Sequence, residues 1–341
     1  MINKTIIIAE AGVNHNGDLN LAKQLIDVAS DADADYVKFQ IFKAKNLVSK
    51  TAKMAAYQKS KSNEIFDSQF NMLKKLELSY EDHHQLIKYC KLKNIKFLTS
   101  AFDLEGLEFV FSLNLDLIKI PSGEITNYQY LKKISSYNSK VILSTGLSTI
   151  EEINIAINIL TSHNLTRDDI IVLHCNTQYP TLLEDVNLRA MLDIKKNCNV
   201  DIGFSDHTLE FETPITAVTL GAKVIEKHFT LSRDLIGPDH AASLEPEELK
   251  NMIKSIRNVE KILSGNGLKI PTKSEIQNKT AVRKSLFTTK KISAGTVIDE
   301  SMLKALRPGD GISPIEIPNL IGKKIINGLE SGTKLNENDF E

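Results

Sequence analysis

The sequence predicts an α/β protein, a (β/α)8 or TIM barrel followed by a small C-terminal β-rich domain. Eight short apolar runs in the first two thirds of the 341 residues have the length of strands, and most precede a helical stretch. Each run ends in polar residues, and a barrel of this kind builds its active site from such groups at the carboxyl ends of its strands. After residue 281 the pattern changes to short β-like pieces broken by turns.

The first strand, expected over residues 5–11, is apolar and β-branched, as buried parallel strands are. Asp18 can cap the helix that follows, because its side chain can accept from free N–H groups of the first turn. The other strands are expected over residues 35–42, 96–102, 116–121, 140–145, 169–175, 201–205 and 223–229. Ser148 and Glu151 predict a capping box, and the last barrel helix is expected to begin near Glu245 and stop at Gly265.

A long polar connection, from Lys43 to about Ser79, separates the second and third strands. Helical stretches are expected in it at residues 54–57 and 70–76, and its length is typical of a functional cover on the substrate side. We predict a barrel over residues 1–265, a linker over 266–281 and a separate module over 282–341. A module of about sixty residues is near the lower limit for independent folding, so we expect it to lean on the barrel or on a second chain.

Composition excludes several classes of protein. The chain is 42% hydrophobic and 25% charged with a net charge of −1, so no overall field favours nucleic acid or an anionic membrane. No apolar stretch approaches membrane-spanning length, and no signal-peptide pattern is present. The three cysteines show no paired or metal-ligand spacing, which is typical of reduced thiols. We therefore expect a cytoplasmic protein without nucleic-acid or membrane partners.

Two histidines, His207 and His228, end consecutive strands, which allows both side chains to point into one site. Neutral imidazoles bind divalent ions of Mn, Fe, Zn or Co, and two protein ligands leave positions open for substrate and water. With Asp206 and Asp239 nearby in the sequence, the pair predicts a catalytic metal site. The competing interpretation is that one or both histidines only cap a strand through hydrogen bonds.

Two lysines, Lys38 and Lys119, lie inside apolar strands. Burying an ammonium group without an anion costs on the order of several kcal/mol. Structural ion pairs with Glu10 or Glu226 are one explanation, and a bound phosphate-type ligand is the other. The second is favoured by hydroxyls and by a helix start that follow these strands, at Ser122, Ser144 and Gly146.

Glu10 and Glu124 are expected at the barrel mouth, where either could act as a general base, hold a sugar hydroxyl or pair with a lysine. Asn176 and Tyr179 lie just past the sixth strand and are expected to orient ligand. Arg307 lies in a turn-forming Arg-Pro-Gly-Asp-Gly segment of the C-terminal module, and it becomes a substrate donor if that module covers the mouth.

Longer motifs spread over nearly the whole chain are specific when taken together. They are Ala9-Glu10-Ala11-Gly12-Val13-Asn14-His15-Asn16-Gly17, Val37-Lys38-Phe39-Gln40, Lys119-Ile120-Pro121-Ser122-Gly123-Glu124, Ser144-Thr145-Gly146, His174-Cys175-Asn176-Thr177-Gln178-Tyr179-Pro180, Gly203-Phe204-Ser205-Asp206-His207, Glu226-Lys227-His228-Phe229-Thr230 and Gly237-Pro238-Asp239-His240. The chain with these motifs resembles the N-acetylneuraminate (sialic acid) synthase family, and residues from Val282 onward resemble its antifreeze-like (SAF) domain. Two departures are Ala11, where members often carry Ile, and Thr177, where some carry Asn.

The resemblance implies condensation of phosphoenolpyruvate with the open-chain aldehyde of an N-acetylated sugar. The expected product is N-acetylneuraminate, made from N-acetylmannosamine. The family would bind Mn²⁺, or Mg²⁺ or Co²⁺ in its place, through His207 and His228. It would hold phosphoenolpyruvate through Lys38, Gln40, Lys119, Ser122, Ser144 and Tyr179. It would surround the sugar and the attacking water with Glu10, Glu124, Asp239 and, from the partner chain of a domain-swapped homodimer, Arg307.

Three alternatives stay open at this point. A legionaminic or pseudaminic acid synthase would use a different N-acetylated sugar. A metal-dependent pyruvate aldolase would not need two buried lysines, and it would release no phosphate. A non-catalytic carbohydrate-binding protein would leave the histidine pair unexplained.

Overall fold

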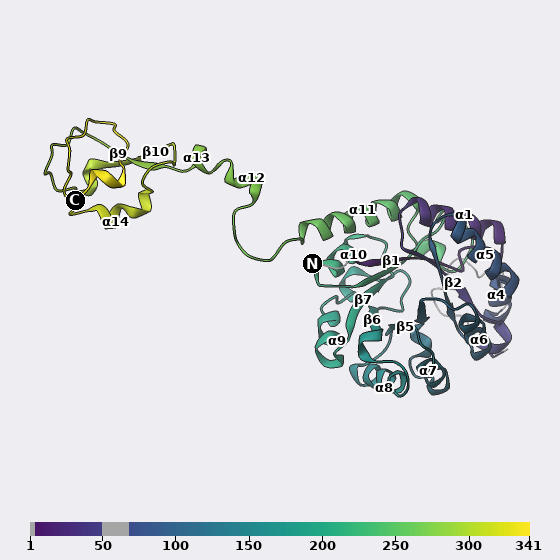
Figure 1. Ribbon diagram of the computed structural model, residues 1–341. Coiled ribbons are helices and arrows are strands. Elements are labelled where there is room, and N and C mark those ends of the chain that lie inside the picture. The colour runs from purple at the N-terminus through teal and green to yellow at the C-terminus, as the bar shows by residue number, and fades with distance from the viewer. Residues whose placement is uncertain (1–3, 50–67) are drawn as a thin grey trace. The chain divides into compact units, whose positions relative to one another are not determined.

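Eight parallel strands close into a barrel in sequence order, which confirms the predicted fold (Figure 1). The computed structural model describes residues 4–49 and 68–341, so the helix expected at 54–57 lies outside the described residues. The strands are β1 Ile6–Gly12, β2 Tyr36–Ile41, β3 Lys96–Ala101, β4 Leu117–Ile120, β5 Lys140–Ser144, β6 Ile170–Cys175, β7 Asp201–Asp206 and β8 Val224–His228. Each strand end lies within about one residue of its expected position, because buried parallel strands are continuous apolar runs.

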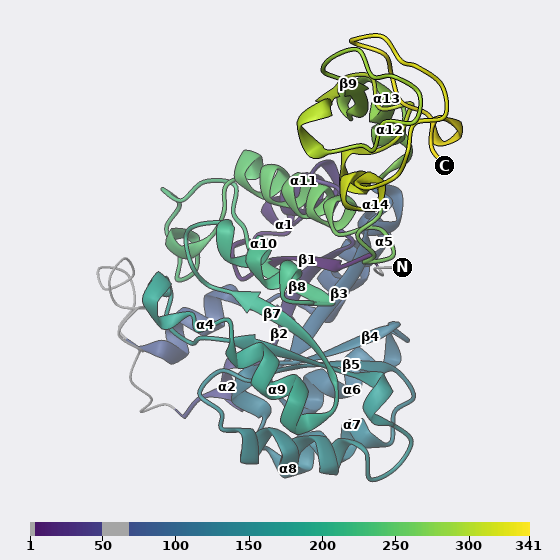
Figure 2. The same ribbon diagram turned by 90° about the vertical axis from the view of Figure 1, so that its left-hand side faces the viewer.

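Helices surround the barrel. They are α1 Leu19–Asp31, α2 Ala44–Leu47, α4 Gln69–Leu76, α5 Tyr80–Leu92, α6 Leu104–Ser112, α7 Tyr128–Ser135, α8 Ile150–Leu160, α9 Ala190–Cys198, α10 Glu212–Thr219 and α11 Pro246–Ile262. Asp18 caps α1 as predicted, and α4 confirms the helix expected at 70–76. Within the connection between β2 and β3, α2 and α4 pack side by side at one end of the barrel (Figure 2).

Two helix boundaries in the structure differ from the predicted ones. The capping box of α8 joins Thr149 to Glu152, not Ser148 to Glu151. Both pairs have the required spacing of three residues, and the sequence pattern alone does not choose between them. The last barrel helix, α11, ends at Ile262 before it reaches Gly265.

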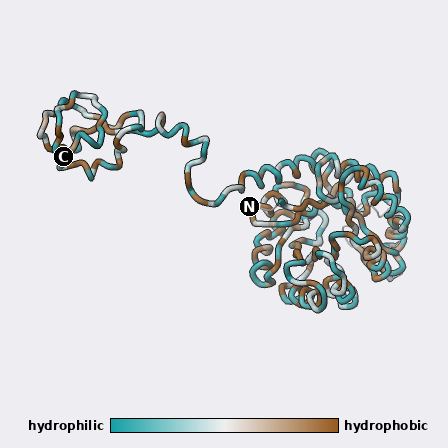
Figure 3. The backbone as a smooth tube through the Cα atoms, in the orientation of Figure 1, coloured by the Kyte–Doolittle hydropathy of each residue, from teal (hydrophilic) through white to brown (hydrophobic). Residues whose placement is uncertain are grey.

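The interior of the barrel is built in layers. An apolar layer of inward-facing side chains fills one end: Ile8, Tyr36, Leu98, Leu117, Ile142, Leu173 and Val224. Because alternate residues of a strand share a face, the residue two positions further along each of these strands also faces inward. Except for a cysteine, those residues are polar or charged: Glu10, Lys38, Ser100, Lys119, Ser144, Cys175 and Glu226. A larger apolar cluster fills the space between strands and helices, and Figure 3 shows the strands as mainly hydrophobic.

Residues from Gly265 to Glu341 form a second compact unit. It contains α12 Lys273–Ile276, α13 Lys279–Val282, the antiparallel strands β9 Ser285–Thr288 and β10 Leu303–Leu306, and α14 Ile317–Leu320. It has its own apolar core, which includes Leu286, Ile298 and Leu335. The finer division into a linker over 266–281 and a module over 282–341 stays a prediction. Among the described residues, no helix is both long and apolar enough to cross a membrane.

Candidate active site

A cavity of about 330 Å³ opens where the eight strands end, and we call it the inner cavity. Each of the eight strands, or the turn that directly follows it, contributes a polar side chain to the wall of this cavity. The lining includes Glu10, Lys38, Gln40, Ser100, Lys119, Ser122, Ser144, Cys175, Tyr179, Ser205, His207, Glu226 and His228. The strand order therefore brings together most of the residues that the sequence marked as functional.

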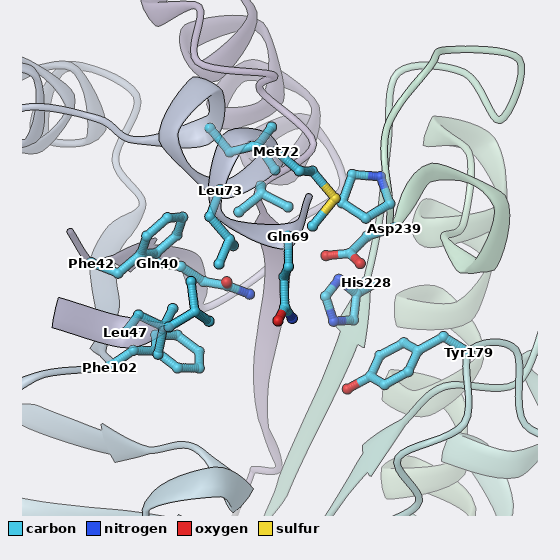
Figure 4. A pocket seen from close by; sticks show the side chains of 14 residues that line it. Gln40, Phe42, Leu47, Gln69, Met72, Leu73, Phe102, Tyr179, His228 and Asp239 are labelled. Carbon is cyan, nitrogen blue, oxygen red and sulfur yellow. The ribbon is translucent and has the colours of Figure 1, made fainter. Parts of the chain in front are cut away.

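A second cavity of about 290 Å³ adjoins the first, and we call it the outer cavity. The two share the lining residues Gln40, Phe102, Tyr179 and His228. Most of the remaining lining is apolar: Val13, Phe42, Leu47, Val48, Met72, Leu73, Leu76 and Pro238. In Figure 4 the apolar side chains face His228, Asp239 and Tyr179 across the space. The wall that α2 and α4 supply agrees with the expectation that this connection covers the substrate side.

Two buried ammonium groups lie at the floor of the inner cavity. Lys38 and Lys119 are each only 3% exposed. Lys38 Nζ lies 2.8 Å from Glu10 Oε2 and 3.7 Å from Glu226 Oε2, and Lys119 Nζ lies 3.3 Å from Glu226 Oε1. The ion pairs considered as the competing interpretation therefore exist. They leave the lysines facing the cavity, so the pairs do not exclude a bound anion.

The two carboxyl groups of this cluster differ in their tendency to ionise. Burial raises the pKa of Glu10 to about 7, against the opposing effect of Lys38. Burial also opposes ionisation of Glu226, but Lys119 and Lys38 together hold its pKa below the usual range. Near pH 7 only part of the molecules carry an ionised Glu10, so the two lysines face on average fewer than two carboxylates and the cavity floor carries a net positive charge. That balance suits an anionic ligand.

Hydroxyl groups beside the lysines add donors for an anion. Ser144 Oγ is buried in the inner cavity and has no hydrogen-bond partner among the described residues. Such an orphaned group costs free energy unless a ligand or water meets it. Ser122 Oγ accepts from the Gly146 backbone N–H at 2.9 Å. A Cβ at Gly146 would come within 2.4 Å of Thr177 Cγ2, so the tight approach needs glycine.

The histidine pair fits a divalent cation. The ring centroids of His207 and His228 lie 5.5 Å apart, and both rings line the inner cavity. Burial lowers the pKa of His207 to about 4 and the pKa of His228 well below its usual value, so both are neutral and can act as ligands. His207 Nδ1 donates to the Asn176 carbonyl at 2.5 Å, which leaves the Nε2 lone pair for a metal. His228 Nδ1 is buried without a partner among the described residues.

Within the barrel unit, Glu124 and Asn176 were predicted as site residues but are not among the residues that line the inner cavity. Glu124 is buried, accepts from Asn127 Nδ2 at 2.6 Å and lines neither space. The Asn176 side chain donates to the Asp185 carbonyl, so only its backbone reaches His207. Arg307 is exposed in the C-terminal unit, where its Nε donates to the Val282 carbonyl.

Asp239 lines the outer cavity next to His228, and burial raises its pKa to about 6. Four inward-facing residues were not predicted as site residues, although the strand period marks them, and one of them is Cys175 at the end of β6. Ser205 and Glu226 each stand two positions before a histidine, and Ser100 stands beside Lys119 in the strand register. The sequence analysis named Glu226 as an ion-pair partner and as part of a family motif, but it gave Glu226 no role in the site.

The fold and the site together define a barrel protein whose inner cavity combines two buried ammonium groups with two neutral imidazoles. The model of the NeuB family matches residues 25–269, and the model of the SAF domain matches residues 283–341. The chain is 50% identical to N,N'-diacetyllegionaminic acid synthase of Campylobacter jejuni over 94% of this chain and 95% of the relative. It is 45% identical to the enzyme of the same name from Legionella pneumophila, over 96% and 92%.

More distant relatives include human N-acetylneuraminate-9-phosphate synthase, 33% identical over 97% of this chain and 91% of the relative. The crystal structure of N-acetylneuraminic acid (sialic acid) synthetase from Leptospira borgpetersenii in complex with citrate has a TM-score of 0.69. It is 33% identical and covers 82% of this chain and 93% of that one. This chain belongs to the NeuB family and is a phosphoenolpyruvate-dependent sugar-acid synthase with a C-terminal SAF domain.

Proposed function

We propose that this protein condenses phosphoenolpyruvate with an aldehyde sugar carrying two acetamido groups, giving N,N'-diacetyllegionaminic acid and phosphate. The relatives named for this product are 50% and 45% identical, against 33% for the human N-acetylneuraminate-9-phosphate synthase. The proposal therefore replaces N-acetylneuraminate, our first expectation, with its alternative. The observation that supports it is the apolar wall of the outer cavity, because acetamido methyl groups favour apolar contacts over water.

In the proposed reaction, the methylene carbon of phosphoenolpyruvate forms a C–C bond to the aldehyde carbon. Water adds to the carbon that carries the phosphate oxygen, and phosphate leaves by C–O cleavage. Lys38, Lys119 and Ser144 hold the phosphate and carboxylate, so that both reactants are aligned. Glu10, a carboxyl group that lines the inner cavity and has a pKa near neutrality, takes the proton of the attacking water. The former aldehyde oxygen takes up one proton and becomes a hydroxyl, so the proton that the water loses is balanced.

We also propose that His207 and His228 hold a divalent cation, with Mn²⁺ as the expected ion and Mg²⁺ or Co²⁺ as substitutes. When bound, the ion supplies Lewis-acid polarisation of the aldehyde oxygen. The two imidazoles are neutral, lie in one cavity and leave most coordination positions to water and substrate. Full activity after thorough chelation would contradict this assignment.

A substrate panel tests the product assignment. Purified protein, phosphoenolpyruvate and Mn²⁺ are combined with N-acetylmannosamine or with the diacetamido sugar, and phosphate release and product mass are measured. We expect kcat/KM to be at least about tenfold higher for the diacetamido sugar, since one pocket-filling group is worth roughly 1–3 kcal/mol. Equal or better use of N-acetylmannosamine would overturn the product assignment. Sugar consumption without stoichiometric phosphate would indicate an aldolase instead.

A further inference from the structure

A separate buried ion pair lies in the barrel wall behind the histidines, and the proposed reaction does not use it. Lys227 Nζ lies 2.7 Å from Asp206 Oδ2, and both side chains are 0% exposed. The two residues are direct neighbours across β7 and β8, and each one immediately precedes a histidine of the inner cavity. Since Glu226 and His228 face inward, the alternation along β8 turns Lys227 to the outer face of the wall.

The pair is the centre of a larger hydrogen-bond network. Lys227 Nζ donates to the carbonyls of Thr208 at 2.6 Å and Glu210 at 3.0 Å. Asp206 accepts from the Thr208 backbone N–H at 2.9 Å and from Thr213 Oγ1 at 2.7 Å. Thr213 belongs to α10. The network therefore ties together the ends of both strands, the loop that leaves His207 and the helix that follows.

Stability alone is a poor explanation for this pair. Taking two charges out of water is costly, and an apolar pair of similar volume is often as stable or more so. What the charged pair adds is geometric. It fixes β7 against β8 next to the histidines and holds the loop after His207 in one path.

A site with only two protein ligands depends strongly on how those ligands are held. Within residues 4–49 and 68–341, no group of three or more His, Cys, Asp or Glu side chains is placed to bind a metal. The Asn176 carbonyl orients the ring of His207, but it does not fix the distance between the two imidazoles. That distance follows from the relative position of the two strand ends. The network around Lys227 and Asp206 holds these ends directly.

We infer that Asp206 and Lys227 are positioning residues that set the spacing of His207 and His228 for a divalent cation. The inference rests on the proposed metal role of the two histidines. Neither residue of the pair touches the cavity. Their effect is expected on cation affinity, and not on the chemical step once the site is filled.

The test is Mn²⁺ binding to the substrate-free protein, measured by EPR of the free ion during titration. Asp206→Leu combined with Lys227→Met replaces both charges with apolar groups and leaves neither charge unpaired. We expect Mn²⁺ affinity to fall by about 10–100-fold, as when outer partners of metal ligands are removed. Activity at saturating Mn²⁺ is expected to return to near the wild-type value.

Control variants separate this role from a general effect on folding. Arg257→Met breaks ion pairs to Asp35 and Glu260 at the opposite end of the barrel, and it should lower Tm without changing Mn²⁺ affinity. Lys227→Arg keeps the charge but alters its reach, and it is expected to weaken Mn²⁺ binding by about tenfold. It serves as the deciding variant if the double variant does not fold.

The outcomes distinguish two failures. Mn²⁺ affinity within twofold of wild type in a folded pair variant overturns the positioning role. Equal Mn²⁺ affinity of the wild type and His207→Ala, or no binding by the wild type, overturns the metal assignment itself.

Discussion

The inner and outer cavities adjoin each other but are built from different parts of the chain. The inner cavity is lined by charged and hydroxyl side chains of the barrel strands, whereas much of the apolar lining of the outer cavity comes from α2 and α4. The strands thus supply the groups suited to phosphoenolpyruvate. The connection between β2 and β3 supplies the surface that the far end of a sugar would meet. Relatives that use different sugars would therefore share the inner cavity and differ in the outer one.

The largest expected effect is the loss of a buried lysine from the inner cavity. Lys119→Met removes an anion partner and leaves Glu226 with less compensation, so kcat/KM should fall by at least about a thousandfold, or roughly 4 kcal/mol. Steady-state kinetics and phosphoenolpyruvate binding measure it. Lys96→Met is the matched control. Lys96 is the first residue of β3, far from the strand ends that line the inner cavity, and it forms an exposed ion pair with Asp116. Similar losses in both variants would contradict a special role for Lys119.

An effect of comparable size is expected at Glu10, but on the turnover number. Glu10→Gln removes the proposed base while keeping a side chain of similar size. The turnover number should fall by about 10²–10⁴-fold with little change in phosphoenolpyruvate affinity. Glu124→Gln is the comparison variant, since Glu124 lines neither cavity. A larger loss in Glu124→Gln would make Glu124 the base.

The pH profile gives an independent view of the inner cavity. Burial raises the pKa of Glu10 to about 7, so the ionised form that accepts a proton becomes scarce as the pH falls. Below pH 7, kcat/KM should decrease by about tenfold per pH unit. The same acidic limb should be absent from the residual activity of Glu10→Gln. An unchanged limb in that variant would assign the titration to another group.

In the outer cavity, a substitution should change which sugar is preferred more than how fast it reacts. Met72 is 1% exposed and lines the apolar wall. Met72→Gln should lower the ratio of kcat/KM for the diacetamido sugar to that for N-acetylmannosamine by about tenfold. The ratio is insensitive to partial unfolding, which lowers both values equally. Met72→Leu should leave the ratio nearly unchanged, and parallel losses for both sugars in Met72→Gln would argue against a role in selectivity.

The smallest effect concerns the C-terminal unit and the predicted domain-swapped homodimer. If Arg307 acts on the partner chain's site, mixing Arg307→Ala with Glu10→Gln after subunit exchange gives dimers with one intact site. Activity should then recover to about a quarter of wild type, as random pairing and one working site per mixed dimer require. Each variant alone is the control. No recovery after demonstrated subunit exchange would place Arg307 in its own chain's site or outside any site.

Much of the inner cavity could be predicted because its residues follow a strict rule. A barrel strand alternates sides, so Lys38 and Lys119 inside apolar strands had to meet an anion or a carboxylate, and the structure holds the carboxylates. Glu124 was expected at the mouth from its place after β4. The short turn Ser122–Glu124 instead directs its carboxylate to Asn127, a local hydrogen bond that strand spacing does not encode.

The outer cavity was less accessible to prediction. Phe42 and Leu47 are ordinary apolar residues in the sequence, and Met72 and Leu76 have the spacing of any helix that packs on a core. That they border an open space depends on how α2 and α4 pack beside the barrel, which local pattern does not determine. Asp206 is an example of the opposite error. Its place beside His207 in the sequence indicated a metal site, but the alternation of side chains along β7 turns it to the outer face of the barrel wall.

Because the interior is layered, the chemistry of this barrel is sensitive to a shift of one residue along a strand. Inserting one amino acid into β8 would rotate Glu226 and His228 toward the helices and bring Lys227 into the lumen, while the strand could remain hydrogen-bonded to its neighbours. Natural length variation should therefore concentrate in the connecting loops, and the strands should tolerate exchanges of side chains far better than gaps.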